Sequence, residues 1–153
     1  MLAKEVKVVN HPQFSRLLEH EISELMIPAS KVAHVQLGNS LEHALLVLIK
    51  SGYSAVPVLD LDYKIHGQIS TTLIMESILG IERIEYETLH EHKVEEVMNP
   101  KIPRIRQQEN FMRALELSIN HPYVCIEDDQ GVFLGILTRR AILAILYRYF
   151  RES

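Results

Sequence analysis

Two segments of this 153-residue sequence repeat each other in residue type and in order. The first runs from "LMIP" to "TTLIMESIL", and the second runs from "VMNP" to "TRRAILAIL". The matching residues recur in register, with slightly shorter loops in the second copy: Met26 with Met98, Pro28 with Pro100, Ala44 with Ala114, Val56 with Val124, Asp60 with Asp128, and Gly67 with Gly135. Such a duplication constrains the fold, because each copy must form the same structural unit.

Each copy predicts the element order β-α-β-β-α. A short strand, "AHVQL" or "IPRIR", precedes an amphipathic helix that begins at a good N-cap residue, Ser40 or Asn110. An apolar strand, a turn and a third strand follow, and a second helix covers residues 71–79 or 139–150. The predicted fold class is therefore α/β (α+β). A unit of about 55 residues buries too little surface alone, so we expect the two repeats to pack sheet to sheet with pseudo-two-fold symmetry.

This pattern divides the chain into an N-terminal segment (1–21), a first repeat (22–82), a polar connector (83–93) and a second repeat (94–150). The N-terminal segment lacks the apolar run of a signal peptide, and the longest apolar stretch, "HALLVLI", is too short to cross a bilayer. The single cysteine, Cys125, lies in an apolar strand, where we expect it to be buried. We therefore expect a cytoplasmic protein that does not contact membranes.

The charge balance argues against a nucleic-acid-binding protein. The chain has 16 basic and 20 acidic residues, whereas proteins that wrap DNA or RNA normally carry a basic excess. No nucleophile motif, phosphate-binding loop or pair of acids at a motif spacing occurs, so we expect no enzyme and no catalytic residues. His90 and His92 have no second ligand pair in the sequence, which disfavours a metal site.

With these features together, the sequence resembles a tandem pair of CBS domains, a Bateman module, from Leu25 to Phe150. The resemblance rests on "GYSAVPVLD", on the strand-to-helix joints that begin at Gly67 and Gly135, and on the "LMIP" and "VMNP" openings. It implies a regulatory protein that binds an adenine nucleotide between its repeats. Main-chain groups of one repeat would hold the base, and the strand-to-helix joint of the other repeat would hold sugar and phosphate.

The sequence departs from the family pattern at both joints. The family ends the joint with an aspartate that binds the ribose hydroxyls, whereas this chain has Leu73 and Ala141. The second joint instead carries Arg139 and Arg140 directly after Thr138. A guanidinium group matches phosphate oxygens, and the first turn of a helix adds N–H groups and a positive dipole end. The joint therefore favours a phosphodiester over a mononucleotide.

The family geometry implies that this joint faces the front of the first repeat. Lys31 would add a third cation, the small residues Ala33 and Ala55 would let a base approach the backbone, and Tyr53 offers a ring for stacking. The full predicted ligand-binding set is Lys31, Val32, Ala33, His34, Tyr53, Ser54, Ala55, Val56, Thr138, Arg139 and Arg140. The opposite cleft, with Arg104, Tyr123 and Ser70, offers fewer phosphate partners, so we expect one good site per chain.

These residues also have plain structural explanations. Arg139 and Arg140 could be surface residues, although two cations at a helix N-terminus are unfavourable without an anion. Lys31 could be a solvated side chain and Tyr53 a half-buried core aromatic. His34 could be an outward-facing strand histidine.

The segments "SKVAHVQ", "LEHALLVL" and "LTRR" are similar to those of small stand-alone CBS-pair proteins of Gram-positive bacteria that bind cyclic di-AMP. That similarity implies cyclic di-AMP as the ligand, no cofactor, and regulation of a (p)ppGpp synthetase/hydrolase or of pyruvate carboxylase. The apolar helix ends "ILAILYRYF" and "LIMESILGI" favour a homodimer. Two alternatives stay open: a sensor of AMP, ADP or ATP, and an adaptor without a ligand whose CBS pair only dimerises.

Overall fold

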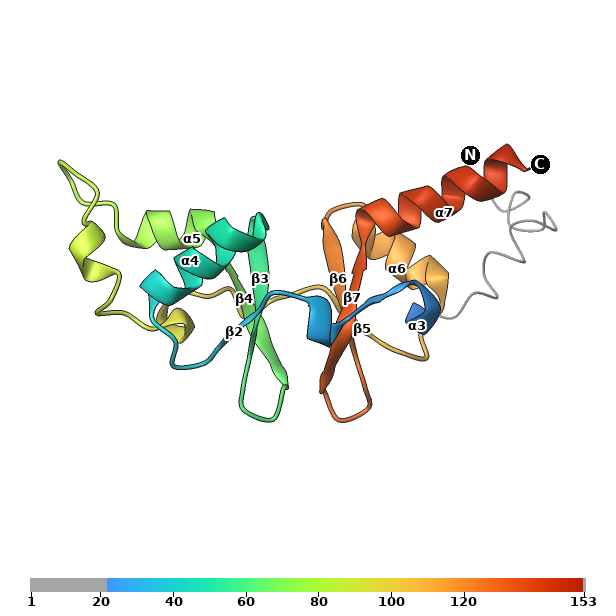
Figure 1. Cartoon of the computed structure of the whole chain (residues 1–153), viewed down its shortest axis with the longest axis horizontal. Helices are drawn as coiled ribbons and strands as arrows, with labels where there is room; N and C mark the ends of the chain where they lie inside the picture. Colours follow the sequence, from blue (N-terminus) through green and yellow to red (C-terminus); the bar gives the residue numbers. More distant parts are fainter. Residues whose placement is uncertain (1–21, 153) are drawn as a thin grey trace, which may run out of the picture. The chain divides into compact units, whose positions relative to one another are not determined.

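The computed structural model describes residues 22–152 and divides them into two compact units (Figure 1). The repeat-1 unit contains residues 31–102 together with the turn 129–133. The repeat-2 unit contains the described residues 22–30, 103–128 and 134–152. The predicted N-terminal segment (1–21) lies outside the described residues.

The repeat-1 unit has a three-stranded sheet in the order β2-β3-β4. Strand β2 (Val35–Gln36) is parallel to β3 (Ala55–Leu59), which is antiparallel to β4 (Ile65–Ser70). Helix α4 (Leu41–Ser51) joins β2 to β3, and α5 (Thr71–Ser77) follows β4 directly. The predicted β-α-β-β-α order is confirmed for this copy.

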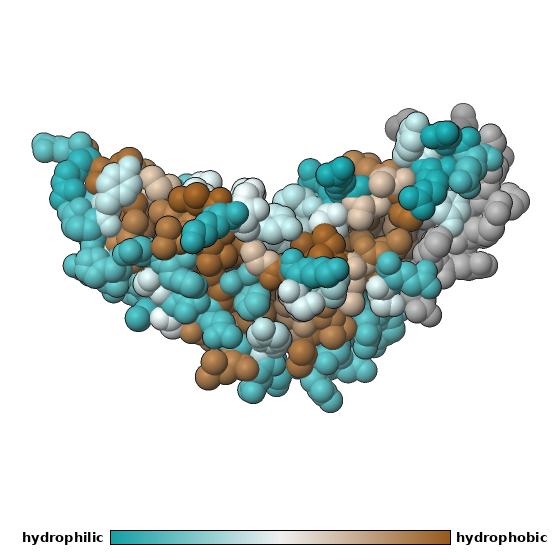
Figure 2. All heavy atoms as spheres, viewed as in Figure 1, coloured by the Kyte–Doolittle hydropathy of each residue, from teal (hydrophilic) through white to brown (hydrophobic). Residues whose placement is uncertain are grey.

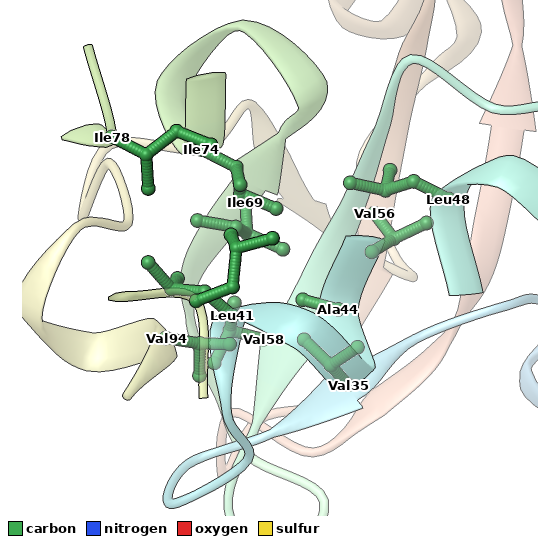
Figure 3. Packing of buried hydrophobic residues seen from close by; sticks show 11 residues of the cluster. Val35, Leu41, Ala44, Leu48, Val56, Val58, Ile69, Ile74, Ile78 and Val94 are labelled. Atoms are coloured by element: carbon green, nitrogen blue, oxygen red, sulfur yellow. The ribbon is translucent and has the colours of Figure 1, made fainter. Parts of the chain in front are cut away.

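The core of this unit explains why these segments adopt their structure. The Ser40 side chain accepts a hydrogen bond from the His43 N–H and so caps α4, as predicted. The buried positions of α4 are spaced three and four residues apart, which gives the helix one apolar face toward the sheet. Figure 3 shows most of the resulting cluster: Val35, Leu41, Ala44, Leu48, Val56, Val58, Ile69, Ile74, Ile78, Leu89 and Val94.

The segment predicted as a polar connector also contributes to this core. Leu89 is only 7% exposed, and the chain turns there through two short 3-10 helices, η3 (Tyr86–Thr88) and η4 (Val94–Glu96). The Leu41 N–H donates to the His92 carbonyl, and the Glu42 N–H donates to the Leu89 carbonyl. These bonds satisfy first-turn N–H groups of α4, so this segment supports the helix as well as linking the repeats.

The repeat-2 unit has a four-stranded sheet in the order β1-β7-β6-β5. Its own strands are β5 (Arg104–Arg106), β6 (Tyr123–Glu127) and β7 (Phe133–Thr138). Helix α6 (Phe111–Ser118) begins at Asn110, the predicted cap, and α7 (Arg139–Arg151) follows β7. The same β-α-β-β-α order is confirmed. Packing of the two units sheet to sheet, with pseudo-two-fold symmetry, stays a prediction.

An additional strand and helix precede the first repeat's own elements. Helix α3 (Ile22–Leu25) leads into β1 (Ile27–Pro28), and Ile22 is buried in the repeat-2 core. That core consists of Ile22, Ile105, Phe111, Ala114, Val124, Ile126, Leu137, Ile142 and Ile145. The start of the described chain therefore belongs structurally to the second repeat.

The two repeats exchange their opening segments. Strand β1 pairs antiparallel with β7, placing Pro28 opposite Gly135. In the repeat-1 unit, Asn99 and Gln68 of β4 exchange two backbone hydrogen bonds of 2.9 Å. A Cβ atom on Gly135 would overlap the Ile27 carbonyl oxygen, and one on Gly67 would overlap that of Asn99. Glycine is thus required at both joints, because each admits a backbone from the other copy's opening segment.

Apolar side chains remain exposed on several helices. They include Leu46 and Ile49 on α4, and Leu143, Tyr147 and Phe150 on α7. Figure 2 shows apolar side chains among hydrophilic ones on one face. Within residues 22–152, no helix is long and apolar enough to span a membrane.

Candidate functional site

The first half of the predicted site surrounds the start of β3 in the repeat-1 unit. Lys31 is exposed, Val32 is buried, and Ala33 and His34 are half-buried just before β2. Tyr53 and Ser54 are exposed between α4 and β3, where the Ser54 carbonyl accepts from the Thr71 N–H over 3.1 Å. The half-buried Ala55 and the buried Val56 open β3 itself. The structure thus brings the eight predicted residues of the first repeat into one region.

The main chain is open here, because strands β2 and β3 pair only at their far ends. The paired residues are Val35 with Val58 and Gln36 with Leu59. Extending this register would require residue 57 to donate to the Ala33 carbonyl, but Pro57 has no N–H. No residue between 22 and 152 donates a hydrogen bond to that carbonyl. The Ala33 carbonyl is therefore available to a ligand.

In the second repeat, the carbonyl equivalent to that of Ala33 does accept a hydrogen bond. The residue of this repeat equivalent to Pro57 is Cys125, whose N–H donates to the Pro103 carbonyl over 2.9 Å. Cys125 is buried, which confirms the prediction that it is a packing residue, and burial raises the pKa of its thiol. The sequence predicted only the burial of Cys125, and the structure adds a difference in hydrogen bonding between Cys125 and its equivalent, Pro57.

His34 stabilises the open segment from its side chain. Its Nδ1 lies 3.2 Å from the Val32 carbonyl oxygen. Because a carbonyl only accepts, this contact is a hydrogen bond when Nδ1 carries the proton. The imidazole also lies edge-on to the Tyr63 ring, with a centroid distance of 5.4 Å and an interplanar angle of 80°. His34 thus precedes β2 and has two specific contacts.

The second half of the predicted site lies at the start of α7 in the repeat-2 unit. Thr138 is the N-cap, and its hydroxyl accepts from the Ala141 N–H over 3.0 Å. Arg139 is half-buried, and its Nε donates over 2.8 Å to the Ser118 carbonyl at the end of α6, where the helix dipole favours a cation. Arg140 is exposed, and its side chain makes no hydrogen bond or ion pair to another described residue. Arg139 is therefore anchored, whereas Arg140 can reach an anion.

The positions of the family's ribose-binding aspartate are apolar at both joints. Leu73 packs against the repeat-1 core and Ala141 against the repeat-2 core. Their N–H groups are bonded to the capping hydroxyls of Ser70 and Thr138. Neither joint can therefore offer a carboxylate to a ribose at this position.

The groups predicted for the opposite cleft are already engaged within their own units. Arg104 lies 3.9 Å from Glu127, and Ser70 caps α5. Tyr123 is buried, and burial raises the pKa of its hydroxyl. Among the described residues, no group of three His, Cys, Asp or Glu side chains could hold a metal ion.

The predicted site residues thus form two groups: an open backbone edge in the repeat-1 unit and a cationic helix N-terminus in the repeat-2 unit. That these two halves face each other stays a prediction from the family geometry. Sequence reasoning missed Pro57, Tyr63 and Ser118. Only Pro57 had a visible signal, because a proline inside a strand removes a donor from the ladder.

These features define a two-repeat α/β module with a glycine joint in each repeat. A model of the CBS domain matches residues 22–80 and 94–148, so the chain belongs to the CBS-domain family. It is 52% identical over 140 residues to cyclic di-AMP receptor B of Bacillus subtilis, covering 92% of this chain and 95% of that protein. The predicted resemblance is confirmed.

Two solved structures support the same assignment. A CBS domain-containing protein of Bacillus anthracis is 55% identical, with a TM-score of 0.82 over 88% of this chain and 97% of that one. CbpB of Listeria monocytogenes, solved in complex with c-di-AMP, is 50% identical, with a TM-score of 0.81 over 88% of this chain and 100% of that one.

Proposed function

We propose that this protein is a non-catalytic receptor for cyclic di-AMP. The observation that carries the proposal is the Ala33 carbonyl. Because residue 57 is a proline, no described residue donates to this carbonyl, whereas the equivalent carbonyl of the second repeat accepts from Cys125. An adenine presents an amino donor beside a ring-nitrogen acceptor, and an open backbone edge can pair with such groups. We call residues 31–34 and 53–56, which would contact the base, the reading half of the proposed site.

The phosphate half of the proposed site is the joint of Thr138, Arg139 and Arg140. Arg140 has no competing partner among residues 22–152, and it follows the N-cap of a 13-residue helix. Leu73 and Ala141 supply no carboxylate for a free ribose diol, which disfavours mononucleotides. The names of the Bacillus subtilis receptor and of the Listeria monocytogenes complex support the same ligand.

The proposal extends to regulation. A ligand changes the affinity of a partner when it prefers one of two protein states. The resemblance favours a (p)ppGpp synthetase/hydrolase or pyruvate carboxylase as the partner, in the cytoplasm, without a cofactor, DNA or RNA. The exposed Leu143, Tyr147 and Phe150 of α7, with Leu79 and Ile81 after α5, support a homodimer. The functional repeats would span 22–82 and 94–150.

A thermal-shift titration tests the ligand. Wild type, Arg140→Ala and Arg151→Ala would be titrated with cyclic di-AMP, cyclic di-GMP, AMP and ATP. Arg151 is the matched control, because it is exposed on the same helix but at its other end. A ligand at about 100 times Kd adds roughly 2.7 kcal/mol, a shift of several degrees for a chain of this size.

We expect cyclic di-AMP alone to stabilise wild type and Arg151→Ala, and Arg140→Ala to lose the shift. Stabilisation by AMP or ATP instead would make the protein an energy sensor. If no nucleotide binds, the adaptor alternative replaces the proposal.

A further inference from the structure

Tyr63, in the turn between β3 and β4, has a backbone conformation that is unfavourable for its residue type. Its φ of 62° is in the left-handed region, and no other non-glycine residue between 22 and 152 has a positive φ. This region costs about 1 kcal/mol or more for a residue with a Cβ. Side chains held there against such a cost cluster at functional sites.

The second repeat forms the same turn without this cost. The residue equivalent to Tyr63 is Gly131, whose φ is 84°. Glycine adopts this conformation freely. The turn thus requires a left-handed residue in both copies, and only the first copy places an aromatic side chain there. Tyr63 is 42% exposed and belongs to neither hydrophobic core, so core packing does not explain the residue type.

The surrounding turn holds Tyr63 in place. One Asp60 carboxylate oxygen accepts from the Asp62 N–H over 2.8 Å and from the Lys64 N–H over 3.0 Å. The other oxygen lies 2.9 Å from Nε2 of His66. The Tyr63 N–H donates to the Asp60 carbonyl over 3.0 Å. These bonds fix the backbone of the turn from which the Tyr63 ring extends.

The Tyr63 ring contacts His34, which is part of the proposed ligand site. Its edge-on contact with the imidazole restricts the rotation of that ring. His34 Nδ1 can then bond the Val32 carbonyl, which leaves the adjacent Ala33 carbonyl as the open acceptor. In the second repeat the equivalents of His34 and Tyr63 are Arg104 and Gly131, so this arrangement is specific to the first repeat.

We propose that Tyr63 is a positioning residue for the nucleotide-reading backbone, which it orients through His34. The inference rests on the proposed function, because the backbone in question is its reading half. In this proposal Tyr63 contacts His34 but not the ligand. Its role is to preorganise the Val32–Ala33 segment, which reduces the ordering cost of binding.

A double-mutant cycle tests the proposal, with cyclic di-AMP affinity measured by calorimetry and ligand-free stability measured in urea. We expect Tyr63→Gly to bind at least about fivefold more weakly, because preorganisation is lost. Its stability should be unchanged or higher, because glycine relieves the left-handed strain. Tyr63→Phe, which retains the ring, should bind like wild type. In a His34→Ala background, Tyr63→Gly should have no further effect on affinity.

Wild-type affinity for Tyr63→Gly would overturn the positioning role, and so would an equal loss in the His34→Ala background. A second measurement separates this failure from failure of the proposed function. In the ligand-free protein, nitrogen NMR should show the His34 proton on Nδ1 in wild type and a mixture of tautomers in Tyr63→Gly. An unchanged tautomer overturns the inference, whether or not the wild type binds cyclic di-AMP.

Discussion

The two repeats have the same fold, but they differ in which polar groups they leave open. In the first repeat, Pro57 ends the pairing between β2 and β3, and the Ala33 carbonyl has no donor among the described residues. In the second repeat, Cys125 continues the parallel ladder to Pro103. Proline or cysteine at this one strand position thus decides whether the carbonyl on the neighbouring strand is hydrogen-bonded.

The strand-to-helix joints differ as well, and there the distinctive groups belong to the second repeat. The first repeat has Thr71 and Thr72 where the second has Arg139 and Arg140. On the proposed function, the first repeat therefore provides the base-reading edge and the second provides the cations. The proposed function would thus divide one site between the two copies, each of which has a feature that the other lacks.

The largest expected effect concerns a feature that the repeats share. Gly135→Ala should lower the free energy of unfolding by about 3 kcal/mol or more, since the new Cβ would overlap the Ile27 carbonyl and displace β1. Gly67→Ala should have a similar cost through Asn99. Urea denaturation measures both. Gly38→Asn is the reference for backbone strain without overlap, because its φ is 89° and nothing lies within 4 Å of a Cβ there. A loss below about 1 kcal/mol for Gly135→Ala would contradict the close packing of β1 against Gly135.

The next prediction concerns substitutions that add a backbone N–H at residue 57 or remove the one at residue 125. Pro57→Val supplies an N–H that can bond the Ala33 carbonyl, so cyclic di-AMP affinity should fall about tenfold while stability holds. Cys125→Pro removes the bond to Pro103 and should lower the free energy of unfolding by about 1–3 kcal/mol. Calorimetric titration and urea denaturation measure the two effects. Cys125→Val, which keeps the N–H, is the control. Undiminished binding by Pro57→Val would remove the basis of the proposed base contact.

The third prediction separates the two arginines. Arg139→Ala should lower the free energy of unfolding by about 1 kcal/mol, because its Nε bonds the Ser118 carbonyl. Arg140→Ala and Thr72→Ala, the equivalent change in the first repeat, should change stability by less than about 0.5 kcal/mol. Thermal denaturation without ligand measures all three. Equal losses for both arginines would show that Arg140 also has a structural partner.

The smallest expected effect concerns the turn that holds Tyr63. The His66 side chain and the Lys64 N–H lower the pKa of Asp60 below its usual range. A pKa lowered on folding stabilises the protein above the unfolded-state pKa, and this contribution is lost as pH falls through the folded-state value. Between neutral and acidic pH, wild type should therefore lose more stability than Asp60→Asn. Urea midpoints against pH measure this, with Asp62→Asn as control. Parallel curves for wild type and Asp60→Asn would contradict it.

The sequence was sufficient for the local structure of each repeat, since periodicity, caps and turns are encoded within short segments. Ser40 and Asn110 cap the helices as predicted, and Gly67 and Gly135 mark real joints. The exchange of β1 could not be predicted, because a two-residue strand has no period and its sequence does not specify a partner. Leu89 was missed for a related reason, since a single apolar residue in a polar segment gives no pattern.

The predicted site was accessible to sequence reasoning only in part. The arginines were noticeable because they oppose the helix dipole, but their separate contacts depend on where α6 ends. The open edge at Ala33 required the strand register, which fixes the carbonyl that Pro57 cannot bond. The conformation of Tyr63 required its backbone angle, since tyrosine is an unexpected residue at a left-handed position.

The exchanged opening segments also affect the order in which the chain can fold during synthesis. Strand β1 is synthesised before the first repeat's own strands, but its partner β7 is synthesised after that repeat is complete, because Ile27 pairs with Ile136. The repeat-1 unit requires nothing beyond the turn 129–133, whereas the repeat-2 unit joins residues from both ends of the described chain. Contacts so distant in sequence form slowly. A nascent chain that has completed its first repeat therefore still carries β1 without its partner strand, and a chain truncated before β7 cannot pair it.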